Sequence, residues 1–81
     1  MQIRLLLFAV LREVVGSDQK PLELEEGTTA AEVWERLRRE HPRLAAYDTP
    51  PMVAVNQEYA DPATPLRPGD ELAFIPPVSG G

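Results

Sequence analysis

Hydrophobic and polar residues alternate over several short stretches of the chain, a pattern that predicts β-strands. The first alternation covers residues 2–9, where one face carries Ile3, Leu5 and Leu7 and the other carries Arg4, Leu6 and Phe8. Residues 19–25 repeat the alternation. Between them, residues 9–15 fit a short helical turn that Gly16 ends. The two strands therefore predict an antiparallel hairpin with a wide connection.

The spacing of apolar residues then changes from that of a strand to that of a helix. Thr29 and Glu32 fit a capping box, in which the hydroxyl and the carboxylate satisfy backbone amides at the helix start. The apolar stripe that follows consists of Ala30, Val33, Trp34 and Leu37. Pro42 is incompatible with a continuing helix. The pattern predicts one amphipathic helix between Thr29 and Pro42.

The second half of the chain returns to short strands separated by proline-rich connections. In order, we expect a loop over 42–51, a strand over 52–55, a tight turn at Asn56 and Gln57, a return strand over 58–60, a structured loop over 61–70 and a last strand over 71–76. Because a single helix can cover one face of one sheet, this order predicts an α+β domain.

The element order is that of the β-grasp fold, the architecture of ubiquitin. We expect a mixed sheet of about four to five strands, with the main helix packed on one face. The first and last strands should lie parallel and next to each other at the centre. The domain would comprise residues 1–76, and residues 77–81 would form a tail.

Composition excludes several kinds of chemistry. The 81 residues suffice for one domain, and the absence of cysteine excludes a disulfide scaffold, a thiolate zinc site and a cysteine nucleophile. His41 is the single histidine, and we expect no metal site. A net charge of −5 disfavours nucleic acid. No apolar stretch is long enough for a membrane span and no signal peptide is recognisable, so we expect a cytoplasmic protein with no membrane partner.

The end of the sequence is its most informative feature. Gly80 and Gly81 follow the rigid pair Pro76 and Pro77. Glycines lack Cβ atoms, so such a tail can thread a channel too narrow for other residues. Its terminal carboxylate is a poor electrophile until it is activated, for instance as an acyl-adenylate, and can then pass to an amine or a sulfur donor. A frayed tail without function is the alternative interpretation.

Four stretches spread over the chain carry specific motifs: Leu7–Glu13 followed by Gly16, Val53–Tyr59, Pro65–Leu66 with Gly69–Glu71, and Phe74–Gly81. Together and in this order they resemble the sulfur-carrier subunits of molybdopterin synthase, a ubiquitin-like family. The ending Phe-Ile-Pro-Pro-Val-Ser-Gly-Gly is the most specific of the motifs. Residues 29–51 match in pattern only, and Ile75 stands where an aromatic residue is common.

The resemblance implies a cycle of sulfur transfer. An adenylating enzyme would use ATP to convert the Gly81 carboxylate into an acyl-adenylate, and a sulfur donor would convert this into a thiocarboxylate. The chain would then dock on a large catalytic subunit and donate sulfur to a pyranopterin precursor, forming the dithiolene of the molybdenum cofactor. General acids and bases, and the ATP, would belong to the partners, and this chain would bind no cofactor itself.

The predicted sheet has a second apolar face that the helix cannot cover. Leu6, Phe8 and Ile75 would lie on it, with Tyr59 nearby, and surplus apolar groups on an open sheet suggest a docking patch. Alternatively, the 61–70 loop covers them. Arg12 resembles an interface residue of the family, or is a solvated turn charge. The tail contacts implied for the partner are Pro76, Pro77, Val78, Ser79 and Gly80.

Three other functions remain compatible with this sequence. The chain could carry sulfur for thiazole synthesis or tRNA thiolation, and it could be a protein modifier that forms isopeptide bonds with lysines. These two share the activated Gly-Gly end with the first, so the fold cannot separate them. A plain interaction module with an inert tail would show no adenylation at all.

Overall fold

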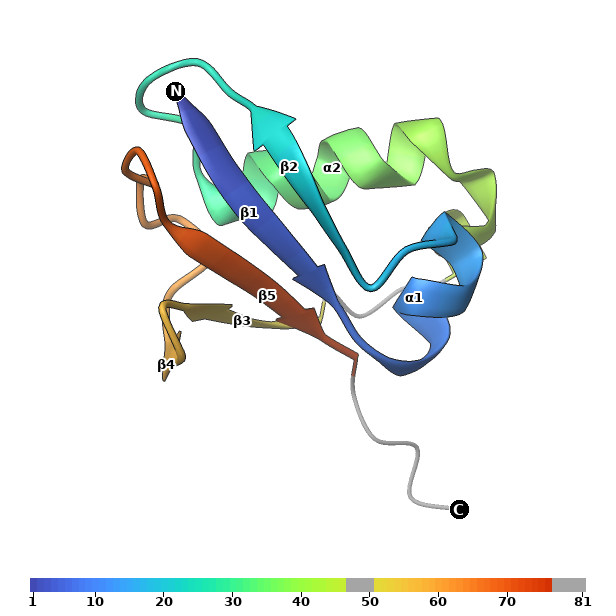
Figure 1. Ribbon diagram of the computed structural model, residues 1–81. Helices are drawn as coiled ribbons and strands as arrows, with labels where there is room; N and C mark the ends of the chain where they lie inside the picture. Colours follow the sequence, from blue (N-terminus) through green and yellow to red (C-terminus); the bar gives the residue numbers. More distant parts are fainter. Residues whose placement is uncertain (47–50, 77–81) are drawn as a thin grey trace.

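The computed structural model describes residues 1–46 and 51–76 (Figure 1). Its elements are β1 (Gln2–Leu7), α1 (Ala9–Val15), β2 (Gln19–Glu23), α2 (Ala30–Glu40), a 3₁₀ helix (Pro42–Ala46), β3 (Met52–Val55), β4 (Glu58–Tyr59) and β5 (Glu71–Ile75). None of the helices in this part of the chain has the length and apolar character needed to span a bilayer.

The five strands form one mixed sheet in the order β2-β1-β5-β3-β4. β1 pairs in parallel with β5 and antiparallel with β2, and β3 pairs antiparallel with β5 and β4. Helix α2 crosses behind the sheet, and α1 lies at the end where β1 and β5 finish (Figure 1). The predicted β-grasp fold, with its first and last strands adjacent and parallel, is confirmed.

The core lies between the sheet and α2. The alternation read from the first strand is confirmed, because Ile3, Leu5 and Leu7 are all buried. The rings of Trp34 and Phe74 pack against each other at a centroid distance of 5.3 Å and an interplanar angle of 58°, a tilted arrangement favourable for aromatic pairs. The helix is thereby fixed on one face of the sheet, and no helix of residues 1–46 and 51–76 lies over the other face (Figure 1).

Two segments are more ordered than the sequence predicted. The turn at 9–15 is a seven-residue helix that buries Leu11 and ends where Gly16 adopts a φ of 89°, a left-handed conformation that glycine tolerates. Residues 42–46 were predicted as loop but form a 3₁₀ helix, because Leu44 is fully buried against the core. Each of these short segments is held by one buried leucine, and a single apolar residue shows no periodicity from which a helix could be predicted.

Helix α2 begins with the predicted capping box. The Thr29 hydroxyl accepts a hydrogen bond from the Glu32 amide at 3.2 Å, and the Glu32 carboxylate accepts one from the Thr29 amide at 3.1 Å. Two of the amides that a helix start leaves without partners are thus satisfied.

Replacing Thr29 with alanine should destabilise the domain by about 1 kcal/mol, the usual cost of losing an N-cap side chain. The change leaves the amide of residue 29 free to bond Glu32. It removes both hydrogen bonds of the hydroxyl, the one accepted from the Glu32 amide and the one donated to the Glu32 carboxylate at 3.1 Å. Chemical denaturation of Thr29→Ala and Thr29→Ser would measure the difference. An alanine variant as stable as the serine variant would contradict the role of the hydroxyl.

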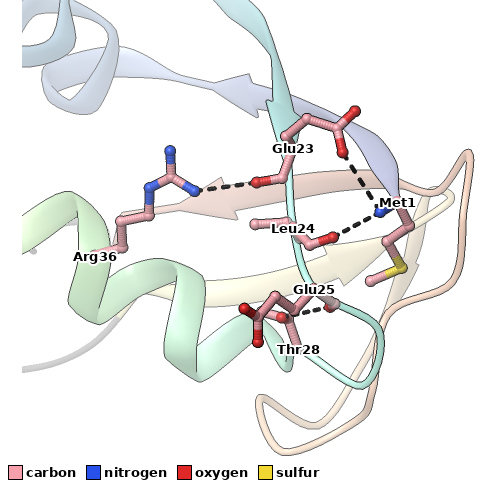
Figure 2. Close-up of polar contacts among 6 residues, drawn as sticks. All are labelled: Met1, Glu23, Leu24, Glu25, Thr28 and Arg36. Atoms are coloured by element: carbon pink, nitrogen blue, oxygen red, sulfur yellow. Dashed lines mark hydrogen bonds and ion pairs between the residues drawn. The ribbon is translucent and has the colours of Figure 1, made fainter.

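The start of β1, the end of β2 and helix α2 are tied together by polar contacts (Figure 2). The Met1 ammonium donates a hydrogen bond to the Leu24 carbonyl at 2.6 Å and lies 3.4 Å from the Glu23 carboxylate. Arg36 reaches across from α2 and donates to the Glu23 carbonyl at 3.2 Å. These contacts hold the outer strand of the sheet against the helix.

Candidate functional site

The sequence directs attention to two places, the Gly-Gly tail and the sheet face opposite α2. The predicted tail residues Pro77, Val78, Ser79, Gly80 and Gly81 lie outside the described residues. Their neighbours do not: Ile75 is the last residue of β5, and both Ile75 and Pro76 are half-buried. The described chain therefore reaches the point where the predicted tail begins.

Strand register gathers apolar side chains on the open sheet face. Leu6 of β1 is level with Ala73 of β5, Ala73 with Ala54 of β3, and Ala54 with Tyr59 of β4. Residues level with one another in neighbouring strands point to the same face. One apolar row therefore crosses four strands, from β1 to β4.

A second, shorter row lies one step closer to the end of β5. There Ile75 is level with Met52 of β3, and both project to the same face as Ala73. Phe8 follows β1 directly and is 46% exposed, while Met52 is 52% and Tyr59 73% exposed. The three large apolar side chains that remain exposed in the described chain thus border this face.

A groove runs over these rows, and we refer to it as the open-face groove. Its lining residues are Leu6, Phe8, Ala54, Gln57, Tyr59, Glu71, Ala73 and Ile75. The convergence of Phe8, Tyr59 and Ile75 at one place agrees with the parity predicted for the strands. Because Ile75 both lines the groove and ends β5, the groove lies at the base of the predicted tail.

The 61–70 loop does not cover the groove. It packs against the helix side instead, where the Ala31 amide donates to the Pro62 carbonyl at 2.9 Å and the Leu66 amide to the Thr28 carbonyl at 2.8 Å. Leu66 is buried in the core between sheet and helix. The alternative in which this loop shields the surplus apolar residues is therefore wrong.

The tight turn before β4 places one wall of the groove. Asn56 and Gln57 adopt φ angles of 52° and 72°, as the two-residue turns of β-hairpins require. The Asn56 side chain is held by Asp70, whose carboxylate accepts from Asn56 Nδ2 at 3.0 Å and from the Arg67 amide at 2.8 Å. The hairpin thus carries Tyr59 to the rim in a fixed position.

Arg12 lies beside the groove on α1. A neighbouring hollow is lined by both Phe8 and Arg12, together with Arg4 and Glu71. Arg4 and Glu71 form an ion pair, whereas no ion pair of Arg12 is recorded within residues 1–46 and 51–76. An exposed cation next to an exposed aromatic ring suits a partner with a carboxylate at this rim.

The other polar residues singled out in the sequence have structural roles and do not form a catalytic or metal-binding cluster within the described residues. Asp70 and Glu71 are taken up by the hydrogen bonds and the ion pair just described, and His41 caps the end of α2. Within the described ranges, no group of three potential ligands could hold a metal ion. Four residues that the sequence did not single out line or border the groove: Met52, Ala54, Gln57 and Ala73. The alternation within the strands is consistent with the positions of Met52, Ala54 and Ala73 on this face.

Comparison with known proteins identifies the family. The ThiS family matches residues 5–81. The molybdopterin synthase sulfur carrier subunit of Chlamydomonas reinhardtii is 40% identical over 83 residues, covering 100% of both chains. Its human namesake is 36% identical over 83 residues, covering 99% of this chain and 94% of its own.

Solved structures share the fold over the whole chain. The small archaeal modifier protein SAMP1 of Haloferax volcanii superimposes with a TM-score of 0.80 at 33% identity, covering 100% of both chains. A chain in the complex of subunits 1 and 2 of molybdopterin-converting factor from Helicobacter pylori covers equally much, with a TM-score of 0.66 and 22% identity, which shows the fold alone. The resemblance predicted from the motifs is confirmed: the chain belongs to the ThiS family.

Proposed function

We propose that this chain is the sulfur carrier subunit of a molybdopterin synthase and that the Gly81 carboxylate carries the sulfur. The observation that carries the proposal is the full-length match, at 40% identity, to a relative of that name. The apolar groove at the end of β5 supports it, because a carrier must dock while its tail enters another protein. The absence of cysteine and the single histidine suit a chain whose catalytic groups are supplied by partners.

In the proposed cycle, the Gly81 carboxylate attacks the α-phosphorus of ATP on an activating enzyme and pyrophosphate leaves. A hydrosulfide equivalent supplied by the donor then attacks the acyl carbon and displaces AMP, giving the thiocarboxylate. Its sulfur forms a carbon–sulfur bond with the pyranopterin precursor on the large subunit, while a carbon–oxygen bond at the attacked carbon breaks and the oxygen leaves with the electron pair. Water then cleaves the acyl–sulfur bond and restores the carboxylate. Two such transfers complete the dithiolene. Because activation consumes ATP, we propose that the chain works in the cytoplasm.

Docking would use the open-face groove, with Phe8, Tyr59 and Ile75 as apolar contacts and Arg12 at the rim. Pro76 and Pro77 would stiffen the exit of the tail, because the proline ring fixes φ. Val78, Ser79 and Gly80 would then lie in the partner's channel and present Gly81. The structure of the Helicobacter pylori complex, which joins subunits 1 and 2 of a molybdopterin-converting factor, supports a partner subunit of this kind.

Intact mass spectrometry tests the proposal. The chain is incubated with a cognate activating enzyme, ATP and a sulfur source, and we expect a mass increase equal to the exchange of one oxygen for sulfur. Addition of the large subunit and the pterin precursor should restore the original mass and yield dithiolene product. A chain that is adenylated but never gains sulfur would refute the carrier function.

A protein modifier is the second candidate, because the chain is 33% identical to SAMP1, a small archaeal modifier protein. Both functions need the activated carboxylate, and they differ in the nucleophile that meets it. Isopeptide-linked conjugates on cellular proteins, in the absence of any thiocarboxylate, would favour the modifier.

A further inference from the structure

The proposed activation creates an acyl electrophile, so the nucleophiles of the chain itself matter. Cysteine is absent, and seven of the eight basic residues are arginine, whose guanidinium is not acylated under these conditions. Within the 81 residues, the only amines are the α-amine of Met1 and the ε-amine of Lys20. The surroundings of these two groups decide whether one activated copy can react with another.

The α-amine of Met1 is engaged at the end of the sheet. It donates to the Leu24 carbonyl at 2.6 Å and faces the Glu23 carboxylate at 3.4 Å (Figure 2). The Met1 side chain is 2% exposed and packs against the core, so the amine cannot swing out freely. Acylation needs a free lone pair on the nitrogen, and the amine would have to give up its hydrogen bond to the Leu24 carbonyl to present one. Attack from this position would require the first residue to leave its site.

Lys20 has different surroundings. It lies on β2, the terminal strand of the sheet, and no further strand in the described residues covers the outer edge. The residue is half-buried and is level with the buried Leu5 of β1, so its stem starts on the helix side of the sheet. Within the described parts of the chain no ion pair holds its ammonium group. Because a lysine stem can stay packed while its end reaches water, the edge position lets the Lys20 amine meet a second copy while the fold stays intact.

We propose that Lys20 is the site at which one activated copy acylates a second copy of this chain, and that the fold withholds the Met1 amine from the same reaction. The proposal rests on the proposed activation of Gly81. The neutral Lys20 Nζ attacks the acyl carbon of the adenylate, a carbon–nitrogen bond forms, and AMP leaves with the electron pair of the broken bond. The amine releases its proton to water, and no oxidant or reductant is needed.

This reaction competes with sulfur transfer, because both consume the same acyl-adenylate. With a sulfur source present, thiocarboxylate formation removes the adenylate. Without one, copies are joined through Lys20. Because each copy has one accessible acceptor and one donor, the products are linear chains.

The experiment uses the intact chain with its activating enzyme and ATP, and without a sulfur source. Hydroxylamine added to a parallel sample traps the adenylate as a hydroxamate and reports activation separately. We expect covalent dimers on a denaturing gel, with tandem mass spectrometry showing a branched peptide in which Gly81 is joined to Lys20 Nζ. Lys20→Arg keeps the charge and should lose these dimers. Arg39→Lys, which adds an amine at an exposed helix position, should gain a second acceptor site.

A chemical probe tests accessibility directly. A brief pulse of an N-hydroxysuccinimide acetate should acetylate Lys20 well before Met1 in the folded chain, and both in denaturant. The proposal is overturned if dimers persist in Lys20→Arg, if Gly81 is found joined to the Met1 amine, or if hydroxamate forms without any Lys20 adduct. Failure to form the hydroxamate would remove the activation step itself, and with it both this proposal and the proposed function.

Discussion

Removal of Gly81 is expected to abolish thiocarboxylate formation while leaving the folded domain unchanged. The shortened chain still ends in a glycine carboxylate, so the reactive group is kept. What changes is the position of that group, which is one residue closer to the domain. One residue of extended chain spans about 3.3–3.6 Å, and a misplacement of about 1 Å can already cost two orders of magnitude in rate. Intact mass after incubation with the activating enzyme, ATP and a sulfur source gives the result.

Two matched variants separate reach from other effects. A chain with one extra glycine appended keeps the same group but displaces it outward, and it should be equally inactive. Gly80→Ala keeps the length and adds one methyl group in the predicted channel, so it should lower transfer without lowering the melting temperature. Full sulfur loading of the chain lacking Gly81 would contradict its assignment as the carrier residue.

Much of the fold followed from local patterns in the sequence. Alternation placed Ile3, Leu5 and Leu7 in the core, and the capping box marked the start of α2. The pairing of β1 with β5, 67 residues apart at Arg4 and Glu71, was inferred from element order rather than from any local signal. The 3₁₀ helix at 42–46 was not predicted, because Leu44 is its single buried leucine and one apolar residue gives no periodic pattern.

The docking face was predictable for a different reason. One helix can shield one sheet face, so the residues of opposite parity had to be exposed or covered by a loop. The sequence left that choice open, because the path of the 61–70 loop depends on backbone hydrogen bonds to the start of α2. The same alternation argument could have placed Met52 and Ala54 on this face, since Val53 between them points inward. The tail chemistry came from the motif alone.

Phe8 offers the sharpest separation between binding and stability. It is 46% exposed, and its part in the N-terminal capping of α1 is through its backbone, whose carbonyl accepts from the Leu11 amide at 3.1 Å. The side chain makes no capping hydrogen bond. Truncation to alanine therefore leaves the helix start intact and removes a ring that is about half in solvent.

Phe8→Ala should weaken binding to the large subunit by about three- to tenfold. Full burial of such a side chain contributes roughly 1.5–3 kcal/mol, so burial of the exposed half of the ring on docking contributes about 0.7–1.5 kcal/mol, and about 1.4 kcal/mol is a factor of ten. Isothermal titration calorimetry against the large subunit measures this change.

The matched control is the other phenylalanine. Phe74 is fully buried against Trp34, so Phe74→Ala should destabilise the domain by about 3–5 kcal/mol, whereas Phe8→Ala should shift the melting temperature only slightly. Tyr59→Ala, at the opposite rim of the groove, should resemble Phe8→Ala in both measurements. If Phe8→Ala binds as tightly as the unmodified chain while Tyr59→Ala does not, the partner contacts only the β3–β4 side of the open-face groove. If neither variant weakens binding, the partner docks elsewhere and the groove is not its site.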